Sequence, residues 1–222
     1  MQALQRSTFR EDAFNKQAEF IKSADTIFDI GANSGQISLQ YHSLYPSAII
    51  YAFEPFPVMF KTLGENTGQV NEISIHKTAI GEKKGKSAFF VNQNVDTNSL
   101  LEPQKMGLSS DKQVVNNDKI EVDVISIDEF CQFNSISQID ILKLDIQGGE
   151  LAALRGAEKM LAAKKIKLIY TEAYFRKQYV NQPLFHDISS YLEQYGYFVQ
   201  DIYNPIYGKG SIAWCDAIFL PL

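Results

Sequence analysis

Two hydrophobic rhythms alternate along this chain. Short runs of β-branched and aromatic residues, typical of buried strands, occupy residues 26–32, 48–54, 73–80, 140–146 and 166–172. Segments with apolar residues at helical spacing lie between several of these runs, at 36–45, 58–65 and 150–163. Strands that alternate with helices in this way predict an α/β fold with a parallel sheet and right-handed crossovers.

The two ends and the middle of the chain depart from this alternation. Residues 1–25 are expected to form a helical extension, with an amphipathic helix at 9–21. Residues 86–128 contain strand patterns separated by a polar segment, which predicts a β insertion without helices whose loop reaches over a pocket. A helix at 184–195 and two strands, 197–203 and 212–220, complete the pattern. No linker of altered composition interrupts it, so residues 1–222 are expected to form a single domain.

Charge and composition exclude several classes of protein. The 222 residues contain 26 acidic and 21 basic side chains, a net charge of -5, which argues against nucleic acid as a partner. No run of about 18 apolar residues and no signal peptide is present, so we expect a cytoplasmic protein without a membrane partner. Cys131 and Cys215 lack a neighbouring His or a C-x-x-C context and are interpreted as packing residues.

The segment from Asp29 to Gly35 is the strongest chemical signal. Gly31 and Gly35 bracket a turn from the first strand into the first helix, where amide groups can face an anion or a carboxylate. Asn33 tolerates the left-handed backbone that such a turn requires. The dinucleotide pattern G-x-G-x-x-G is broken, and Asp29 would repel a pyrophosphate but attract an ammonium or sulfonium group. The alternative interpretation is an ordinary tight turn.

Carboxylates follow other strands at the same expected edge of the sheet. Glu54 ends the second strand, where it can accept hydrogen bonds from the two hydroxyls of a ribose, unless it is simply a solvated strand end. Asp145 ends a central strand that also contains Lys143, and Glu172 ends the next one. Asp145 is expected to reach the crevice. The alternative is a buried ion pair of Lys143 with Asp145 or Glu172 that only organises the sheet.

The order of these motifs resembles a known family. The strings DIGANSGQIS, FEPFP, AIGEKKG, Asn98-Ser99-Leu100, KLDIQGGELAALRGAEKML and Thr171-Glu172 are similar to the FkbM family of S-adenosylmethionine-dependent methyltransferases, over residues 26–172. The resemblance implies a Rossmann-like class I methyltransferase sandwich, with a mostly parallel seven-stranded sheet whose last strand is antiparallel. It also implies cofactor contacts: Asp29, Gly31, Asn33 and Gly35 with the methionine part, Glu54 with the ribose, and Ala79 and Ile80 near the adenine. Gln147 stands where many relatives carry an acid.

The function implied by the resemblance is methyl transfer from S-adenosylmethionine to a hydroxyl of a small molecule or saccharide, leaving S-adenosylhomocysteine. Such a displacement needs a positioned oxygen nucleophile and a nearby base, for which Asp145 is the first candidate and Glu172 the second. A divalent metal between these carboxylates would acidify a hydroxyl, but the spacing does not require one and no metal ligands are assigned. The alternatives are a nicotinamide-dependent oxidoreductase and a catalytically silent cofactor-binding module. Nitrogen acceptors and a homo-oligomer are left open.

Overall fold

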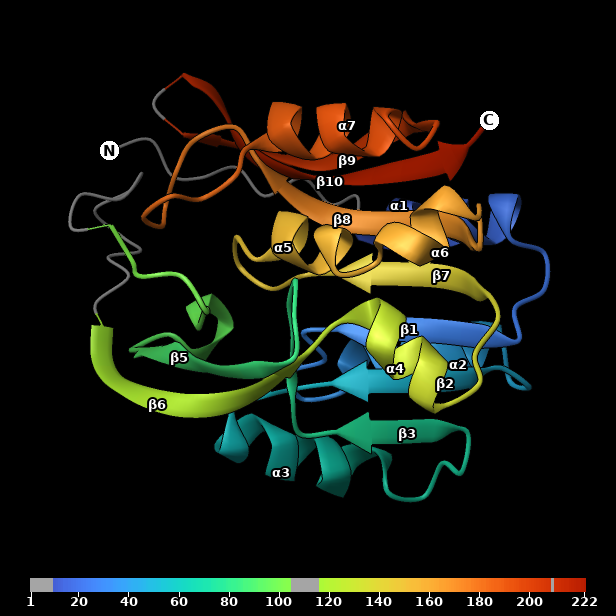
Figure 1. The fold of residues 1–222 in the computed structure, drawn as a ribbon, viewed down its shortest axis with the longest axis horizontal. Coiled ribbons are helices and arrows are strands. Elements are labelled where there is room, and N and C mark those ends of the chain that lie inside the picture. Colours follow the sequence, from blue (N-terminus) through green and yellow to red (C-terminus); the bar gives the residue numbers. More distant parts are fainter. Residues whose placement is uncertain (1–9, 105–115, 209) are drawn as a thin grey trace.

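A seven-stranded sheet forms the centre of the molecule (Figure 1). The computed structural model describes residues 10–104, 116–208 and 210–222. The strand order is β3-β2-β1-β7-β8-β10-β9. The strands are β1 (Thr26–Ile30), β2 (Ile49–Phe53), β3 (Ile73–His76), β7 (Ile139–Leu144), β8 (Ile166–Tyr174), β9 (Tyr197–Gly208) and β10 (Ser211–Pro221). All neighbouring pairs from β3 to β8 are parallel, and β10 runs antiparallel between β8 and β9. The predicted fold class, including its antiparallel last strand, is therefore confirmed.

Helices cover both faces of this sheet. They are α1 (Arg10–Phe20), α2 (Gln36–Leu44), α3 (Pro57–Thr67), α4 (Ile127–Phe133), α5 (Glu150–Arg155), α6 (Glu158–Ala162) and α7 (Phe185–Glu193). Buried side chains of α1, α2 and α3 pack on one face, and those of α4 to α7 pack on the other. Within the described parts of the chain, every helix is too short or too polar to cross a bilayer.

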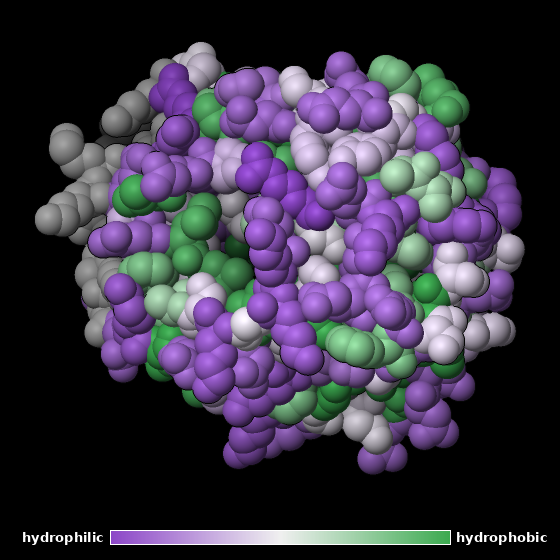
Figure 2. Space-filling model, viewed as in Figure 1, coloured by the Kyte–Doolittle hydropathy of each residue, from purple (hydrophilic) through white to green (hydrophobic). Residues whose placement is uncertain are grey.

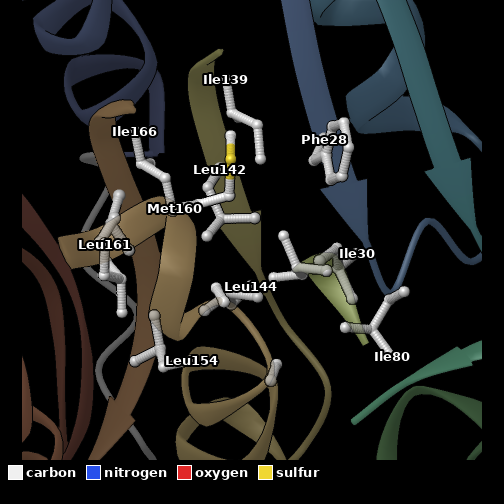
Figure 3. Packing of buried hydrophobic residues seen from close by; sticks show 14 of the residues in the cluster. Phe28, Ile30, Ile80, Ile139, Leu142, Leu144, Leu154, Met160, Leu161 and Ile166 are labelled. Atoms are coloured by element: carbon white, nitrogen blue, oxygen red, sulfur yellow. The ribbon is translucent and has the colours of Figure 1, made fainter. Parts of the chain in front are cut away.

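Strand alternation divides the apolar residues between two cores. Phe28 and Ile30 of β1 point to the α4–α7 face, whereas Ile27 points to the opposite face. Figure 3 shows the first of these clusters, in which Leu142 and Leu144 of β7 pack against Leu154 of α5 and residues of α6. Each side chain of this kind contributes roughly 1.5–3 kcal/mol when it is fully buried. The two cores hold the carboxyl ends of β1, β2 and β7 at one edge.

A second, three-stranded sheet stands beside that edge. It consists of β4 (Ala79–Ile80), β6 (Asn116–Ile125) and β5 (Gly85–Asn92), in that order. The prediction of one continuous strand over 73–80 is wrong, because β3 ends at His76 and the following two-residue strand pairs with β6 instead. The amide of Thr78 donates to the carbonyl of His76 at 3.0 Å, which closes the turn between the two sheets.

Two predictions about helices are also wrong. The insertion contains a short 3-10 helix, η1 (Val95–Thr97), and strand β6 gives way to α4 at Ser126, which forms a capping box with Glu129. The helix predicted over 150–163 is broken into α5 and α6. At the break, a Cβ on Gly156 would lie 2.2 Å from the carbonyl oxygen of Gly81, so the backbones touch there. Asp128 of α4 then accepts hydrogen bonds from two amides in the first turn of α6, at 2.8 and 3.1 Å.

Candidate active site

The turn between β1 and α2 requires glycine for steric reasons. Gly31 has φ +80° and Gly35 has φ +86°, while Asn33 adopts φ +50° between them. A Cβ on Gly31 would lie only 2.0 Å from the carbonyl oxygen of Asp145, since the amide of Asp145 donates to the carbonyl of Ile30 at 3.1 Å. The turn and the end of β7 therefore lie in direct backbone contact.

Asp29 is fully buried beneath this turn and is already paired. Its Oδ1 lies 2.8 Å from Nζ of Lys143, its neighbour on the adjacent strand β7, and its Oδ2 accepts a hydrogen bond of 2.6 Å from Ser38. Nζ of Lys143 also donates to the carbonyl of Gly31 at 3.1 Å. Burial acts to lower the pKa of Lys143, but the carboxylates of Asp29, Asp145 and Glu54 together more than offset this, so the pKa of Lys143 is raised.

This pair corrects the sequence interpretation of the central strand. The ion-pair partner of Lys143 is Asp29, and neither Asp145 nor Glu172 takes that place. Asp145 lies just beyond the end of β7 and is exposed, so it does not share the buried surroundings of Lys143. The negative charge of Asp29, expected to face a cation, is neutralised inside the protein.

Glu54 follows β2 and is held by the backbone on both sides. Its Oε2 accepts a hydrogen bond from the amide of Asn33 at 3.0 Å, and its Oε1 accepts one from the amide of Phe56 at 2.8 Å. The residue is 7% exposed. Burial raises the pKa of the Glu54 carboxyl to about 7, although the two amides act in the opposite direction. A carboxyl group whose pKa lies near neutral pH is thus located next to the glycine turn.

The two residues expected near an adenine have buried side chains. Ala79 packs in the core of the small sheet, and Ile80 packs in the core between the main sheet and α4 to α7. Only their backbones can face a ligand. A groove of about 660 Å³ lies beside them, bordered by His76, Thr78 and Phe130. The glycine turn and the carboxylates at the ends of β2, β7 and β8 do not line this groove.

The carboxyl ends of β7 and β8 meet through the side chain of Gln147. Its Nε2 donates to Oδ1 of Asp145 at 3.1 Å and to Oε2 of Glu172 at 2.8 Å. Its Oε1 lies 3.0 Å from the hydroxyl of Tyr174 and 3.2 Å from that of Tyr179. Each of these hydroxyls shares its single proton with a shorter contact, to Oε2 of Glu172 at 2.6 Å and to the carbonyl of Thr97 at 2.8 Å. Both amide protons of Gln147 are therefore used by the two carboxyl groups, which fixes the orientation of the amide.

The two carboxyl groups differ in their surroundings. Burial and the nearby charge of Asp145 raise the pKa of Glu172 well above its ordinary value, and the 2.6 Å hydrogen bond from Tyr174 offsets only part of this. Asp145 is exposed. Glu172 consequently keeps its proton to a higher pH than an ordinary glutamate does. Asp145 is the one that faces solvent.

Sequence reasoning assigned no hydrogen-bonding role to the two tyrosines of this network. Tyr174 lies two residues after Glu172 on β8, so strand periodicity places both side chains on one face and gives a signal for Tyr174. Tyr179 lies in the segment between β8 and α7 and carries no such signal.

A buried carboxyl supports the loop that presents Asp145 and Gln147. Oε1 of Glu150, which is 2% exposed, accepts hydrogen bonds from the amides of Ile146 and Gly148, both at 3.1 Å. Burial raises the pKa of Glu150 to about 7. These bonds stabilise a loop in which Gln147 and Gly148 both have positive φ.

The insertion reaches this edge through residues 92–101, which we call the strap. Oδ1 of Asp96 accepts from Nδ2 of Asn33 at 3.1 Å, and the carbonyl of Thr97 accepts from the hydroxyl of Tyr179 at 2.8 Å. Oγ of Ser99 donates to the carbonyl of Gln147 at 2.8 Å. One short segment therefore contacts the glycine turn, the loop after β7 and the segment after β8.

The figures show where this edge lies in the molecule. In Figure 1 the small sheet and the strap lie on the side toward which the arrowheads of β2, β3 and β7 point. On the same side, Figure 2 shows apolar side chains around a hollow, with polar residues surrounding them. Among the residues that the structure describes, no three His, Cys, Asp or Glu side chains gather as metal ligands would.

Known proteins match the chain over most of its length. The profile of the Methyltransferase FkbM domain matches residues 29–199. The chain is 27% identical to the 2-O-methyltransferase NoeI of Sinorhizobium fredii, over 72% of this chain and 68% of that protein. It is 24% identical to the 31-O-demethyl-FK506 methyltransferase FkbM of Streptomyces tacrolimicus, over 71% of this chain and 68% of that protein.

Solved structures share the fold. The methyltransferase FkbM of Methylobacillus flagellatus superposes with a TM-score of 0.58 at 18% identity, covering 89% of this chain. This chain spans only 44% of that protein's length. The magnesium protoporphyrin IX methyltransferase of Synechocystis, solved with S-adenosylmethionine bound, superposes with a TM-score of 0.53 at 11% identity, over 96% of this chain and 77% of the other. Because the profile match covers well over half of the residues, the chain belongs to the FkbM family of methyltransferases.

Proposed function

We propose that this methyltransferase transfers the methyl group of S-adenosylmethionine to a hydroxyl of a small molecule or saccharide. The observation that carries the proposal is the meeting of Glu54, the glycine turn and Asp145 at one edge of the parallel sheet. The names of two relatives, a 2-O-methyltransferase and a 31-O-demethyl-FK506 methyltransferase, support an oxygen acceptor. A third relative, the hexuronic acid methyltransferase AglP of Haloferax volcanii, supports a saccharide.

The residues at the edge fit the cofactor. Each oxygen of Glu54 accepts one amide hydrogen bond and keeps a lone pair, so the carboxylate can accept from both hydroxyls of a ribose. Because Gly31 has no side chain, the turn packs directly against the backbone of Asp145, which keeps the turn and the end of β7 together. The amides at the start of α2 can face the carboxylate of the methionine part. When bound, S-adenosylmethionine supplies an electrophilic methyl group on a cationic sulfur.

The polar network at the ends of β7 and β8 suits the acceptor. The exposed carboxylate of Asp145 takes the proton of the acceptor hydroxyl as the oxygen attacks. Gln147 keeps one oxygen of Asp145 and one of Glu172 in place. Glu172, whose pKa is raised by burial, orients the acceptor. Positioning of this kind supplies much of the rate in a bimolecular displacement.

Two measurements test the proposal. Calorimetry should detect binding of S-adenosylhomocysteine to the wild-type protein and a clear loss of affinity in Glu54→Ala, with NADH as the control that does not bind. Labelled methyl transfer to a panel of hydroxylated acceptors should fall roughly 10²–10⁴-fold in Asp145→Asn, with cofactor affinity retained. Absence of S-adenosylhomocysteine binding, or an Asp145→Asn protein with unchanged turnover, would contradict the proposal.

A further inference from the structure

The strap carries an acidic side chain that sequence reasoning assigned to no site. We propose that Asp96 binds the α-ammonium group of the methionine part of the cofactor, so that the β insertion completes the cofactor site. This inference rests on the proposed function. It concerns a different part of the cofactor from the ribose that Glu54 is proposed to hold.

Asp96 lies directly beside the glycine turn. Asn33, at the centre of the turn, donates through its backbone amide to Glu54 at 3.0 Å and through its side chain to Asp96 at 3.1 Å. The two carboxylates therefore flank the same residue. The ribose and the methionine part are joined through one sulfur atom, so two carboxylates that flank one residue can each contact one of these parts.

The other acidic groups discussed at this edge already have partners or roles. Asp29, the expected counter-charge, is fully buried and pairs with Lys143 at 2.8 Å. Glu54 is held by two amides at the end of β2, and Asp145 is joined through Gln147 to Glu172 on the acceptor side. Asp96 is exposed, and its contact with the turn is a single hydrogen bond to a neutral amide. An ammonium group would make a stronger, charge-assisted bond to the same carboxylate.

The strap is anchored strongly enough to keep Asp96 in place. Thr97, the next residue, is buried, and its carbonyl accepts hydrogen bonds from Tyr179 at 2.8 Å and from the side chain of Asn92. Asn94 accepts from the amide of Asp96 at 3.2 Å and so fixes the start of η1. Ser99, 1% exposed, joins the strap to the loop after β7. Asp96 is thus presented by a pre-organised segment, which reduces the entropy lost on binding.

The test compares three nucleosides by calorimetry on wild-type and Asp96→Asn proteins. S-Adenosylhomocysteine has both the amine and the carboxylate, its decarboxylated analogue keeps only the amine, and 5′-methylthioadenosine has neither. We expect Asp96→Asn to weaken the first two roughly 10- to 100-fold, the range for loss of a charged hydrogen bond, and to leave the third unchanged. Glu102→Gln removes another exposed carboxylate of the insertion and serves as the matched control with unchanged affinities.

The outcomes separate this inference from the function on which it rests. Equal weakening of all three nucleosides, or none, in Asp96→Asn overturns the role of Asp96 while wild-type binding of S-adenosylhomocysteine still supports the proposed function. Weakening of S-adenosylhomocysteine alone also overturns it, because the carboxylate and not the amine would then be the sensed group. Failure of the wild-type protein to bind any of the three refutes the proposed function and this inference with it. Asp96 is exposed, so unchanged thermal unfolding of the variant is expected and serves as a check on folding.

Discussion

The pKa of Glu54 predicts that cofactor affinity depends on pH near neutrality. A carboxylate accepts hydrogen bonds from both ribose hydroxyls, whereas a protonated carboxyl loses one acceptor site. With a pKa of about 7 in the free protein, Glu54 is mostly protonated at pH 6 and mostly ionised at pH 8. Binding that selects the ionised form should therefore be weaker at pH 6 and stronger at pH 8.

The size of the effect follows from the ionised fraction. That fraction rises from about 9% at pH 6 to about 91% at pH 8, so the affinity for S-adenosylhomocysteine should increase up to about tenfold, or about 1.4 kcal/mol. Near pH 7 binding should also release about half a proton, which is measurable by calorimetry in two buffers with different ionisation enthalpies.

Glu54→Gln is the matched control, because the amide keeps the shape of the side chain and does not titrate. Its affinity for S-adenosylhomocysteine should be weaker than that of the ionised wild type and equal at the two pH values. Tighter wild-type binding at pH 6 than at pH 8, or the same pH dependence in Glu54→Gln, would refute the assignment of Glu54 as the pH-dependent ribose ligand.

Three further predictions concern stability. Gly31→Ala should lower the free energy of unfolding by about 2–5 kcal/mol in urea denaturation, from the positive φ and the 2.0 Å contact, whereas Gly85→Ala, with open space around its Cβ, should stay within about 0.5 kcal/mol. Lys143→Met should lower the free energy of unfolding by about 3–5 kcal/mol, because it leaves the buried charge of Asp29 unpaired. The double variant Lys143→Met with Asp29→Asn should recover most of this loss. A loss in the double variant that equals the sum of the two single losses would contradict the prediction. Burial raises the pKa of Glu150 from 4.5 to about 7, so its contribution to stability is lost as pH rises through that range. In the wild type this group should lower the free energy of unfolding by about 3 kcal/mol between pH 4.5 and pH 8, and Glu150→Gln should remove that part of the pH dependence. An unchanged pH dependence of the free energy of unfolding in Glu150→Gln would contradict the prediction.

The local signals of the sequence were sufficient for the main sheet and for its functional edge. Runs of apolar residues of strand length, separated by helical spacing, are properties of neighbouring residues, and they predict an alternation that folds into a parallel sheet. Local patterns also explain why the sequence was sufficient to select Gly31, Glu54 and Asp145 as candidate site residues. Each lies where a strand ends, and the carboxyl ends of parallel strands meet at one edge.

Contacts between distant segments were decided only by the tertiary structure. Lys143 and Asp29 are 114 positions apart, and their pairing depends on the register of β7 against β1, which no local pattern encodes. The turn that moves Ala79 and Ile80 into the second sheet depends on pairing with β6, more than 40 residues later.

The polar network of the candidate site depends on the same long-range contacts. Tyr179 reaches Gln147 from a segment without periodicity. Asp96 reaches Asn33 from an insertion whose sequence predicts a loop over a pocket but not which residues that loop contacts. The sequence by itself determined which glycines and carboxylates lie at the strand ends, because that information is local. The fold decided which charges are neutralised and which are presented, because charge pairing depends on distances across the sheet that only the packed chain defines.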